Sequence, residues 1–129
     1  MRPIVYIAGP ISNPDAGKLF ENLHRFFLKE VQLWKAGFSP INPASDIIAA
    51  IMCGDLTHAD YLAKDQSLVA AAEYIFMLPG WTDSPGAREE YSWAGLYDTT
   101  PVHSMLELNE AVEEDGRDWI DNLPTGPDE

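Results

Sequence analysis

Two uninterrupted apolar runs constrain the fold of this chain more than any other feature. The first, Ile4-Val5-Tyr6-Ile7-Ala8, lies near the N-terminus, and the second, Tyr74-Ile75-Phe76-Met77-Leu78, lies past the middle. Each has the length of a strand and no polar face, which is typical of a central strand in a parallel sheet that is covered on both sides. We therefore expect two buried, parallel strands.

Segments with helical periodicity alternate with these runs and with two shorter apolar ones. The alternation predicts an α/β fold: a single domain of three layers, Rossmann- or flavodoxin-like, around a central parallel sheet of four to five strands. A cap at Ser12-Asn13 with Pro14 near the first helical position predicts the start of the first helix, and Gly37 its end. The other expected elements are a strand at 38–41, helices near 45–52, 58–72 and 85–97, a strand near 101–103, and a short acidic helix after Met105.

Length and charge limit the classes of function. The 129 residues predict one domain over residues 1–120 and an acidic, disordered tail over 121–129, with Trp119 and Ile120 docking on the core or on a second subunit. Nine acids and one base in residues 107–129 supply most of the net charge of -13. Such a chain repels a nucleic-acid backbone, so we expect a small-molecule partner rather than a polymeric nucleic acid.

Other classes are disfavoured by what the sequence contains. Its apolar runs are shorter than a membrane span, and it starts directly with a strand-like run rather than a leader, which predicts a cytoplasmic protein without a membrane partner. Cys53, the single cysteine, excludes a disulfide framework and a multi-thiolate site. The three histidines have no paired ligand spacing, so neither a metal nor another cofactor is expected.

Two carboxylates stand where apolar side chains are expected. Asp65 shares a helical face with Leu62, Leu68, Val69 and Ala72, and Glu90 shares one with Ala87, Tyr91, Ala94 and Tyr97. A buried acid costs several kcal/mol unless it is paired, hydrogen-bonded or neutralised by a raised pKa. Catalysis is one reason for such a placement; an Asp65 on the solvent side of its helix is the plainer alternative.

The loops after the two central strands predict where a ligand binds. In parallel α/β sheets, ligands bind beyond the carboxyl ends of the strands, so Gly9-Pro10 and Pro79-Gly80-Trp81 should border one crevice if their strands are neighbours. Ser84, as a cap, with Pro85 and Gly86 predicts a helix start nearby, whose amides and dipole suit an anion.

Three motifs in this order resemble the nucleoside 2-deoxyribosyltransferase superfamily, which includes the 2′-deoxynucleoside 5′-monophosphate N-glycosidases. They are Tyr6-Ile7-Ala8-Gly9-Pro10, then Asp65 in a helix before a strand, then Ser84-x-Gly86-x-x-x-Glu90-x-x-x-Ala94. The resemblance spans residues 3–103, and Leu78-Pro79-Gly80-Trp81 is most similar to small phage and bacterial members.

The resemblance implies roles for three residues. Glu90 would be the nucleophile at C1′ of the sugar, Asp65 would assist proton transfer to the leaving base, and Tyr6 would position Glu90 or the sugar. General chemistry agrees, because a carboxylate stabilises or captures an oxocarbenium-like centre while a second acid protonates the departing nitrogen. We expect burial to raise the pKa of Asp65. Glu90, in contrast, is expected to remain ionised.

The resemblance also implies a homodimer or larger homo-oligomer and, through Ser84, contact with a 5′-phosphate. Pro10 departs from the pattern, because it stands where the monophosphate-hydrolysing relatives carry a phosphate-binding serine; Ser12 or the amide of Ile11 could substitute. Trp81 could stack on the base or cap the core, and Asp83 could bind a sugar hydroxyl or be solvated.

The expected activity is therefore cleavage of the N-glycosidic bond of a 2′-deoxynucleoside or its 5′-monophosphate, with water or another nucleobase as acceptor. Glu89 competes with Glu90 as nucleophile, but Glu90 has the family spacing. Tyr6 could be only a packed strand aromatic. Two other functions remain open: a non-catalytic module that sequesters a nucleotide, and a hydrolase of another ribosylated nucleotide.

Overall fold

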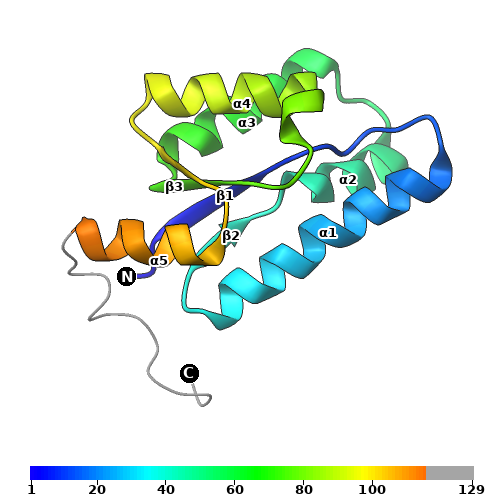
Figure 1. Ribbon diagram of the computed structural model, residues 1–129. Coiled ribbons are helices and arrows are strands. Elements are labelled where there is room, and N and C mark those ends of the chain that lie inside the picture. Colours follow the sequence, from blue (N-terminus) through cyan, green and yellow to red (C-terminus); the bar gives the residue numbers. More distant parts are fainter. Residues whose placement is uncertain (116–129) are drawn as a thin grey trace.

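The computed structural model describes residues 1–115 as one α/β domain (Figure 1). Residues 116–129 lie outside the described part, and with them lie the expected tail and the expected docking of Trp119 and Ile120. The strands are β1 (Ile4–Ala8), β2 (Ser39–Ile41), β3 (Tyr74–Met77) and β4 (Thr100–Val102). The helices are α1 (Ala16–Lys35), α2 (Asp46–Cys53), α3 (His58–Ala71), α4 (Pro85–Leu96) and α5 (Met105–Glu114), with short 3-10 turns η1 (Pro43–Ser45) and η2 (Trp81–Asp83).

The four strands form one parallel sheet in the order β2-β1-β3-β4. In register, Val5 pairs with Tyr74 and Ala8 with Met77. The two apolar runs are thus central strands, as the sequence predicts, and they are neighbours, which is the condition for their loops to border one crevice. The order is the flavodoxin-like one without a fifth strand, and the direction of winding reverses between β1 and β3. The carboxyl ends of these two strands are therefore where a ligand site is expected.

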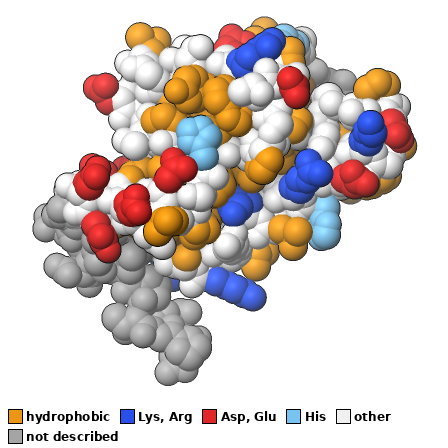
Figure 2. Space-filling model, in the orientation of Figure 1, with side chains coloured by type: hydrophobic (Ala, Val, Ile, Leu, Met, Phe, Trp, Pro, Cys, Tyr) orange, Lys and Arg blue, Asp and Glu red, His pale blue; other side chains and the backbone are white. Residues whose placement is uncertain are grey.

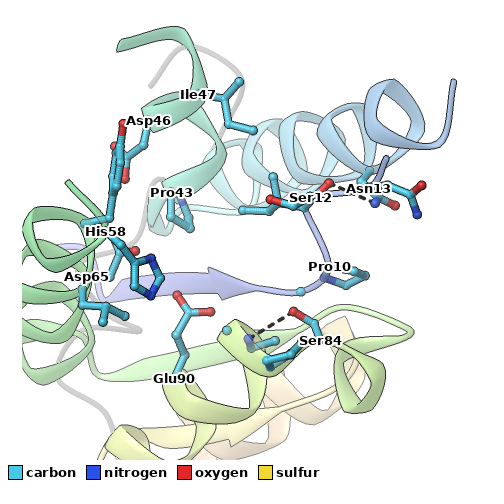
Figure 3. Close-up of a pocket in the computed structure, with 18 of the residues that line it drawn as sticks. Pro10, Ser12, Asn13, Pro43, Asp46, Ile47, His58, Asp65, Ser84 and Glu90 are labelled. Carbon is cyan, nitrogen blue, oxygen red and sulfur yellow. Dashed lines mark hydrogen bonds between the residues drawn. The ribbon is translucent and has the colours of Figure 1, made fainter. Parts of the chain in front are cut away.

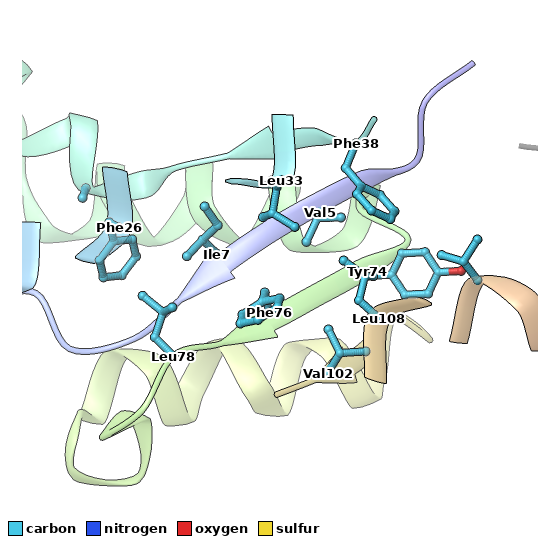
Figure 4. Packing of buried hydrophobic residues seen from close by; sticks show 12 residues of the cluster. Val5, Ile7, Phe26, Leu33, Phe38, Tyr74, Phe76, Leu78, Val102 and Leu108 are labelled. Carbon is cyan, nitrogen blue, oxygen red and sulfur yellow. The ribbon is translucent and has the colours of Figure 1, made fainter. Parts of the chain in front are cut away.

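Two apolar cores lie on opposite faces of the sheet, which gives the three predicted layers. On one face, Phe26 and Leu33 of α1 and Leu108 of α5 pack against Ile7 and Phe76 (Figure 4). On the other face, α3 and α4 pack on a second cluster: Tyr6, Ala8, Val69, Ala72, Ile75, Met77 and Ala94. Alternation along β1 consequently turns Tyr6 toward α3 and α4.

The start of α1 corrects the predicted cap. Asp15, not Ser12 or Asn13, caps the helix by accepting a hydrogen bond from the amide of Gly17. Asn13 instead accepts a bond from the amide of Asp15, so residues 9–15 form a loop. The end is close to the prediction, since α1 stops at Lys35 and Gly37 has a φ of 97°.

Close contact between the loops after β1 and β3 explains one of their glycines. A Cβ atom at Gly9 would lie 2.8 Å from Cβ of Leu78, so only glycine fits there without displacement. The two loops are held against each other where the sheet order reverses.

The described surface is acidic over the last helix. Acidic side chains gather over α5, which carries Glu107, Glu110, Glu113 and Glu114 (Figure 2). Within residues 1–115, none of the helices combines the length and the apolar character that a membrane crossing requires.

Candidate active site

A cavity of about 630 Å³ opens beyond the carboxyl ends of β1 and β3 (Figure 3). The loop after β1, the start of α2, one face of α3 and the first two turns of α4 enclose it. Its volume is typical of small-molecule sites. The predicted site residues that line it are Gly9, Pro10, Ile11, Ser12, Asp65, Asp83, Ser84, Gly86 and Glu90.

Asp65 and Glu90 reach this cavity from different helices. Asp65 lies on α3 and Glu90 on α4, and Figure 3 shows both side chains directed into the same space. The solvent-side alternative for Asp65 is therefore wrong, because its Oδ1 is shielded from solvent. Glu89 is exposed and does not line the cavity.

Tyr6 lies behind Glu90 rather than in the cavity lining. Its side chain is fully buried, and its hydroxyl donates a hydrogen bond to Oε2 of Glu90. This contact fixes one carboxylate oxygen of Glu90 and leaves Oε1 for a ligand. Of the two implied roles of Tyr6, the contact fits positioning of Glu90.

Trp81 corrects one of the predicted contacts. It does not line the cavity; its ring stacks on Tyr91 with 4.7 Å between centroids and lies 6.1 Å from His103. The side chain packs against the core cluster on the α3/α4 side of the sheet. Packing against this cluster thus keeps Trp81 out of the cavity lining.

Burial raises the pKa of both acids. For Asp65, desolvation and then the charge of Asp46 raise the pKa to about 6, against the opposing effect of Lys64. For Glu90, desolvation raises the pKa to about 8; the hydrogen bond from Tyr6 lowers it, and the charges of Asp65 and Glu89 raise it. The raised pKa expected for Asp65 is thus shared by Glu90, which was expected to remain ionised, because Glu90 is buried as well.

The two acids thus hold one proton between them in the range from about pH 6 to about pH 8. Groups this close titrate as a pair, so the proton belongs to the pair rather than to either residue. One proton on two acids is the inventory that an acid and a nucleophile acting together need.

Asp46 is a site residue that the sequence analysis missed. It lines the cavity at the start of α2, is buried, and forms an ion pair with Lys64. The signal was present, because Asp46 follows the carboxyl end of β2 by five residues, where the rule for α/β sheets places ligands.

His58 and Tyr61 are also lining residues that were missed. They share one face of α3 with Leu62 and Asp65, at spacings of three, four and seven residues. Figure 3 shows the His58 ring lying toward the two acids. Helical phase, extended backward from Asp65, would have found both. Asn22, Ile47 and Trp93 line the cavity as well.

The start of α4 matches the predicted cap. Ser84 accepts a hydrogen bond from the amide of Ala87, and Pro85 occupies the first helical position. The amide of Arg88 donates to the carbonyl of Ser84. Gly86 is thus the remaining amide of the first turn that could meet a ligand. Among residues 1–115, no group of three His, Cys, Asp or Glu side chains is arranged to hold a metal ion.

Residues 3–99 match the model of a family described as a domain of unknown function, DUF4406. The chain belongs to the DUF4406 family. The match covers β1 through the residue before β4 and so includes every lining residue of the cavity. No curated protein matches the chain. A solved chain described as "Solution Structure of BlsM" is 24% identical to it, over 86% of this chain and 71% of that chain, with a TM-score of 0.46.

Proposed function

We propose that this DUF4406 protein cleaves the N-glycosidic bond of a 2′-deoxynucleoside or its 5′-monophosphate, as a member of the nucleoside 2-deoxyribosyltransferase superfamily. One observation carries the proposal: Asp65 and Glu90 share one cavity, and Tyr6 holds Glu90 in place. The resemblance of the three sequence motifs to that superfamily adds support, since the same residues supply both arguments.

The first half-reaction uses the single proton of the acid pair. Glu90 as carboxylate attacks C1′ through Oε1, the bond from C1′ to the base nitrogen breaks, and the leaving nitrogen takes the proton from Asp65. The hydrogen bond from Tyr6 keeps the attacking group in one orientation. The products are the free base and a deoxyribosyl ester of Glu90.

The second half-reaction returns the proton. Water, or the N–H of another nucleobase, gives its proton to Asp65 and attacks C1′, and the ester bond to Glu90 breaks. Water yields the free sugar, and a nucleobase yields a new nucleoside. The balance between the two depends on how far the bound ligand excludes water from the cavity.

A second copy of the chain would complete the pocket in this proposal, as in the superfamily it resembles. The cavity is open in the single chain, and α2 at its rim exposes Ile48, Ile51 and Met52. Size-exclusion chromatography with light scattering measures the state, and a monomer that is fully active contradicts this part of the proposal.

The test is a panel of deoxynucleosides and deoxynucleotides, each incubated with and without a second free base, with products separated by chromatography. Base release alone indicates a hydrolase, and a new nucleoside indicates a transferase. Glu90→Ala should reduce turnover by about 10³-fold or more, while Glu110→Ala, at an exposed position of α5 outside the lining, should leave turnover unchanged. Unaltered turnover in folded Glu90→Ala removes the nucleophile, and binding without any base release favours the sequestering module.

A further inference from the structure

The charge of the cavity lining distinguishes among the ligands that it could take. Four carboxyl groups line the cavity: Asp46, Asp65, Asp83 and Glu90. In the described part of the chain, no lysine or arginine lines it. Lys64, which pairs with Asp46, lies outside the lining with its side chain 54% exposed. Lys64 offsets the charge of Asp46, Asp65 and Glu90 share one proton near neutral pH, and His58 is the basic side chain in the lining. Asp83 and the acid pair still leave the lining negative, so it attracts positive charge and repels negative charge.

Several groups that commonly bind a phosphate are lacking here or are already hydrogen-bonded within the chain. Pro10 has no amide hydrogen to offer, and Ser84 and the amides of Ala87 and Arg88 bond to one another at the start of α4. The guanidinium of Arg88 donates to the carbonyl of Thr82 and is not part of the lining. The donors that remain are the amide of Gly86 and, in the loop after β1, the amide of Ile11 and the hydroxyl of Ser12. The partial positive charge of a helix end is about half an elementary charge, less than the negative charge of Asp83 and the Asp65–Glu90 pair together.

One of the lining acids has an acceptor atom without a partner among the described residues. Oδ1 of Asp65 is buried and has no hydrogen-bond partner within residues 1–115. A buried carboxylate oxygen without a donor is costly, so a ligand that brings an N–H or a positive charge is stabilised there. The phosphate group of a nucleotide adds acceptor oxygens and no such donor.

We propose that this cavity selects N-glycosides by charge: it takes nucleosides whose heteroaromatic base carries a positive charge and excludes those that carry a 5′-phosphate. This selection rests on the proposed function for the identity of the bond that is cleaved. A cationic base beside Asp65 also stabilises the ionised form of Glu90, since the two acids interact. The charge that binds the ligand thereby prepares the nucleophile.

The experiment is a binding series in which only charge varies. It compares 2′-deoxyadenosine, its 5′-monophosphate, and two isomers with one added methyl group: 1-methyl-2′-deoxyadenosine, which is cationic at neutral pH, and N6-methyl-2′-deoxyadenosine, which is neutral. Calorimetry with Glu90→Ala measures the affinities without turnover. We expect the cationic isomer to bind roughly tenfold tighter than the neutral isomer, and the monophosphate roughly tenfold weaker than the nucleoside, with both ratios shrinking in salt.

Two variants of the same charge change separate the cavity from the rest of the surface. Asp83→Asn removes one lining charge and should reduce both ratios, whereas Glu110→Gln, on exposed α5, should not. The proposal is overturned by a monophosphate that binds as tightly as the nucleoside, by equal binding of the two methyl isomers, or by no binding at all. The binding series is independent of turnover, so it tests this inference separately from the glycosidase proposal. Base release from a monophosphate in the substrate panel would overturn this inference and leave the glycosidase proposal standing.

Discussion

The phenol of Tyr6 in β1 donates a hydrogen bond to Oε2 of Glu90 in α4, 84 residues away along the chain. Tyr6 is fully buried and therefore cannot exchange this bond for one with water. Burial of the phenol, together with the nearby charge of Glu90, raises the pKa of Tyr6 so far that it stays a donor at every physiological pH. A permanent donor behind a carboxylate holds the carboxylate in place and favours its ionised form.

This bond predicts how the pH profile responds to Tyr6→Phe. In the wild type, kcat/KM should follow a bell with limits near the pKa values of about 6 and about 8, because both acids are protonated below that range and both are ionised above it. Tyr6→Phe removes the bond that lowers the Glu90 pKa, so the upper limit should move to higher pH and the maximum should fall. Initial rates across pH measure this. Tyr91→Phe, on the exposed ring stacked with Trp81, is the matched control; an upper limit that stays in place or moves down in Tyr6→Phe contradicts the assignment.

Asp65→Asn should slow turnover unevenly across substrates. If Asp65 gives its proton to the departing base, its loss matters most where the base is a poor leaving group and least where the base leaves easily. Rates for deoxynucleosides ordered by the basicity of the leaving nitrogen should therefore show a steeper dependence in the variant. Equal slowing across the series would assign Asp65 a role in binding alone.

The sequence predicts the layers of the fold because they depend on local pattern. The strands β1 and β3 are apolar on both faces, and the loop contact at Gly9 joins their ends, so the position of the cavity follows from topology. The sequence alone identifies Asp65 and Glu90 as candidate site residues, because a charged residue at helical spacing among apolar residues can be recognised without a structure. Their convergence required α3 and α4 to pack side by side, which the sequence does not state.

What the sequence could not supply depends on packing between elements. Trp81, like several lining residues, follows the end of a strand. Its ring stacks on Tyr91 and does not line the cavity. Asp46 lines the cavity because α2 packs beside the cavity, and the periodicity of the residues within α2 does not predict that packing. That the pKa of Glu90 is raised as well as that of Asp65 was missed for a related reason: it depends on how far each acid is enclosed, a property of the assembled layers.

The raised pKa of Glu90 predicts that stability falls as pH rises. Below the ordinary pKa of a glutamate, both the folded and the unfolded chain hold the proton, and stability is complete. As pH rises toward about 8, the unfolded chain releases a proton that folded Glu90 retains, so the free energy of unfolding decreases, and it levels off above that pH. Each unit of pKa shift corresponds to about 1.4 kcal/mol.

Glu90→Gln should therefore remove part of this slope. We expect the variant to be more stable than the wild type by about 1 to 3 kcal/mol near pH 8.5 and similar to it near pH 5. Urea unfolding followed by circular dichroism at the two pH values measures the difference. Glu110→Gln, in which an exposed carboxylate of α5 changes, should track the wild type; parallel slopes for all three proteins would show that Glu90 is ionised in the folded chain.

Gly9→Ala should destabilise the fold at the point where the site is built. The added Cβ would lie 2.8 Å from Cβ of Leu78, closer than packed carbons approach, so the loops after β1 and β3 must move apart. Forced overpacking of this kind costs about 1 to 3 kcal/mol. Gly95→Ala is the matched control, because a Cβ there meets nothing within 4 Å and replaces glycine inside α4, which should stabilise the helix by about 0.5 to 1 kcal/mol. Thermal and urea unfolding should thus give opposite signs for the two substitutions. A Gly9→Ala variant as stable as the wild type would contradict the close contact between the two loops.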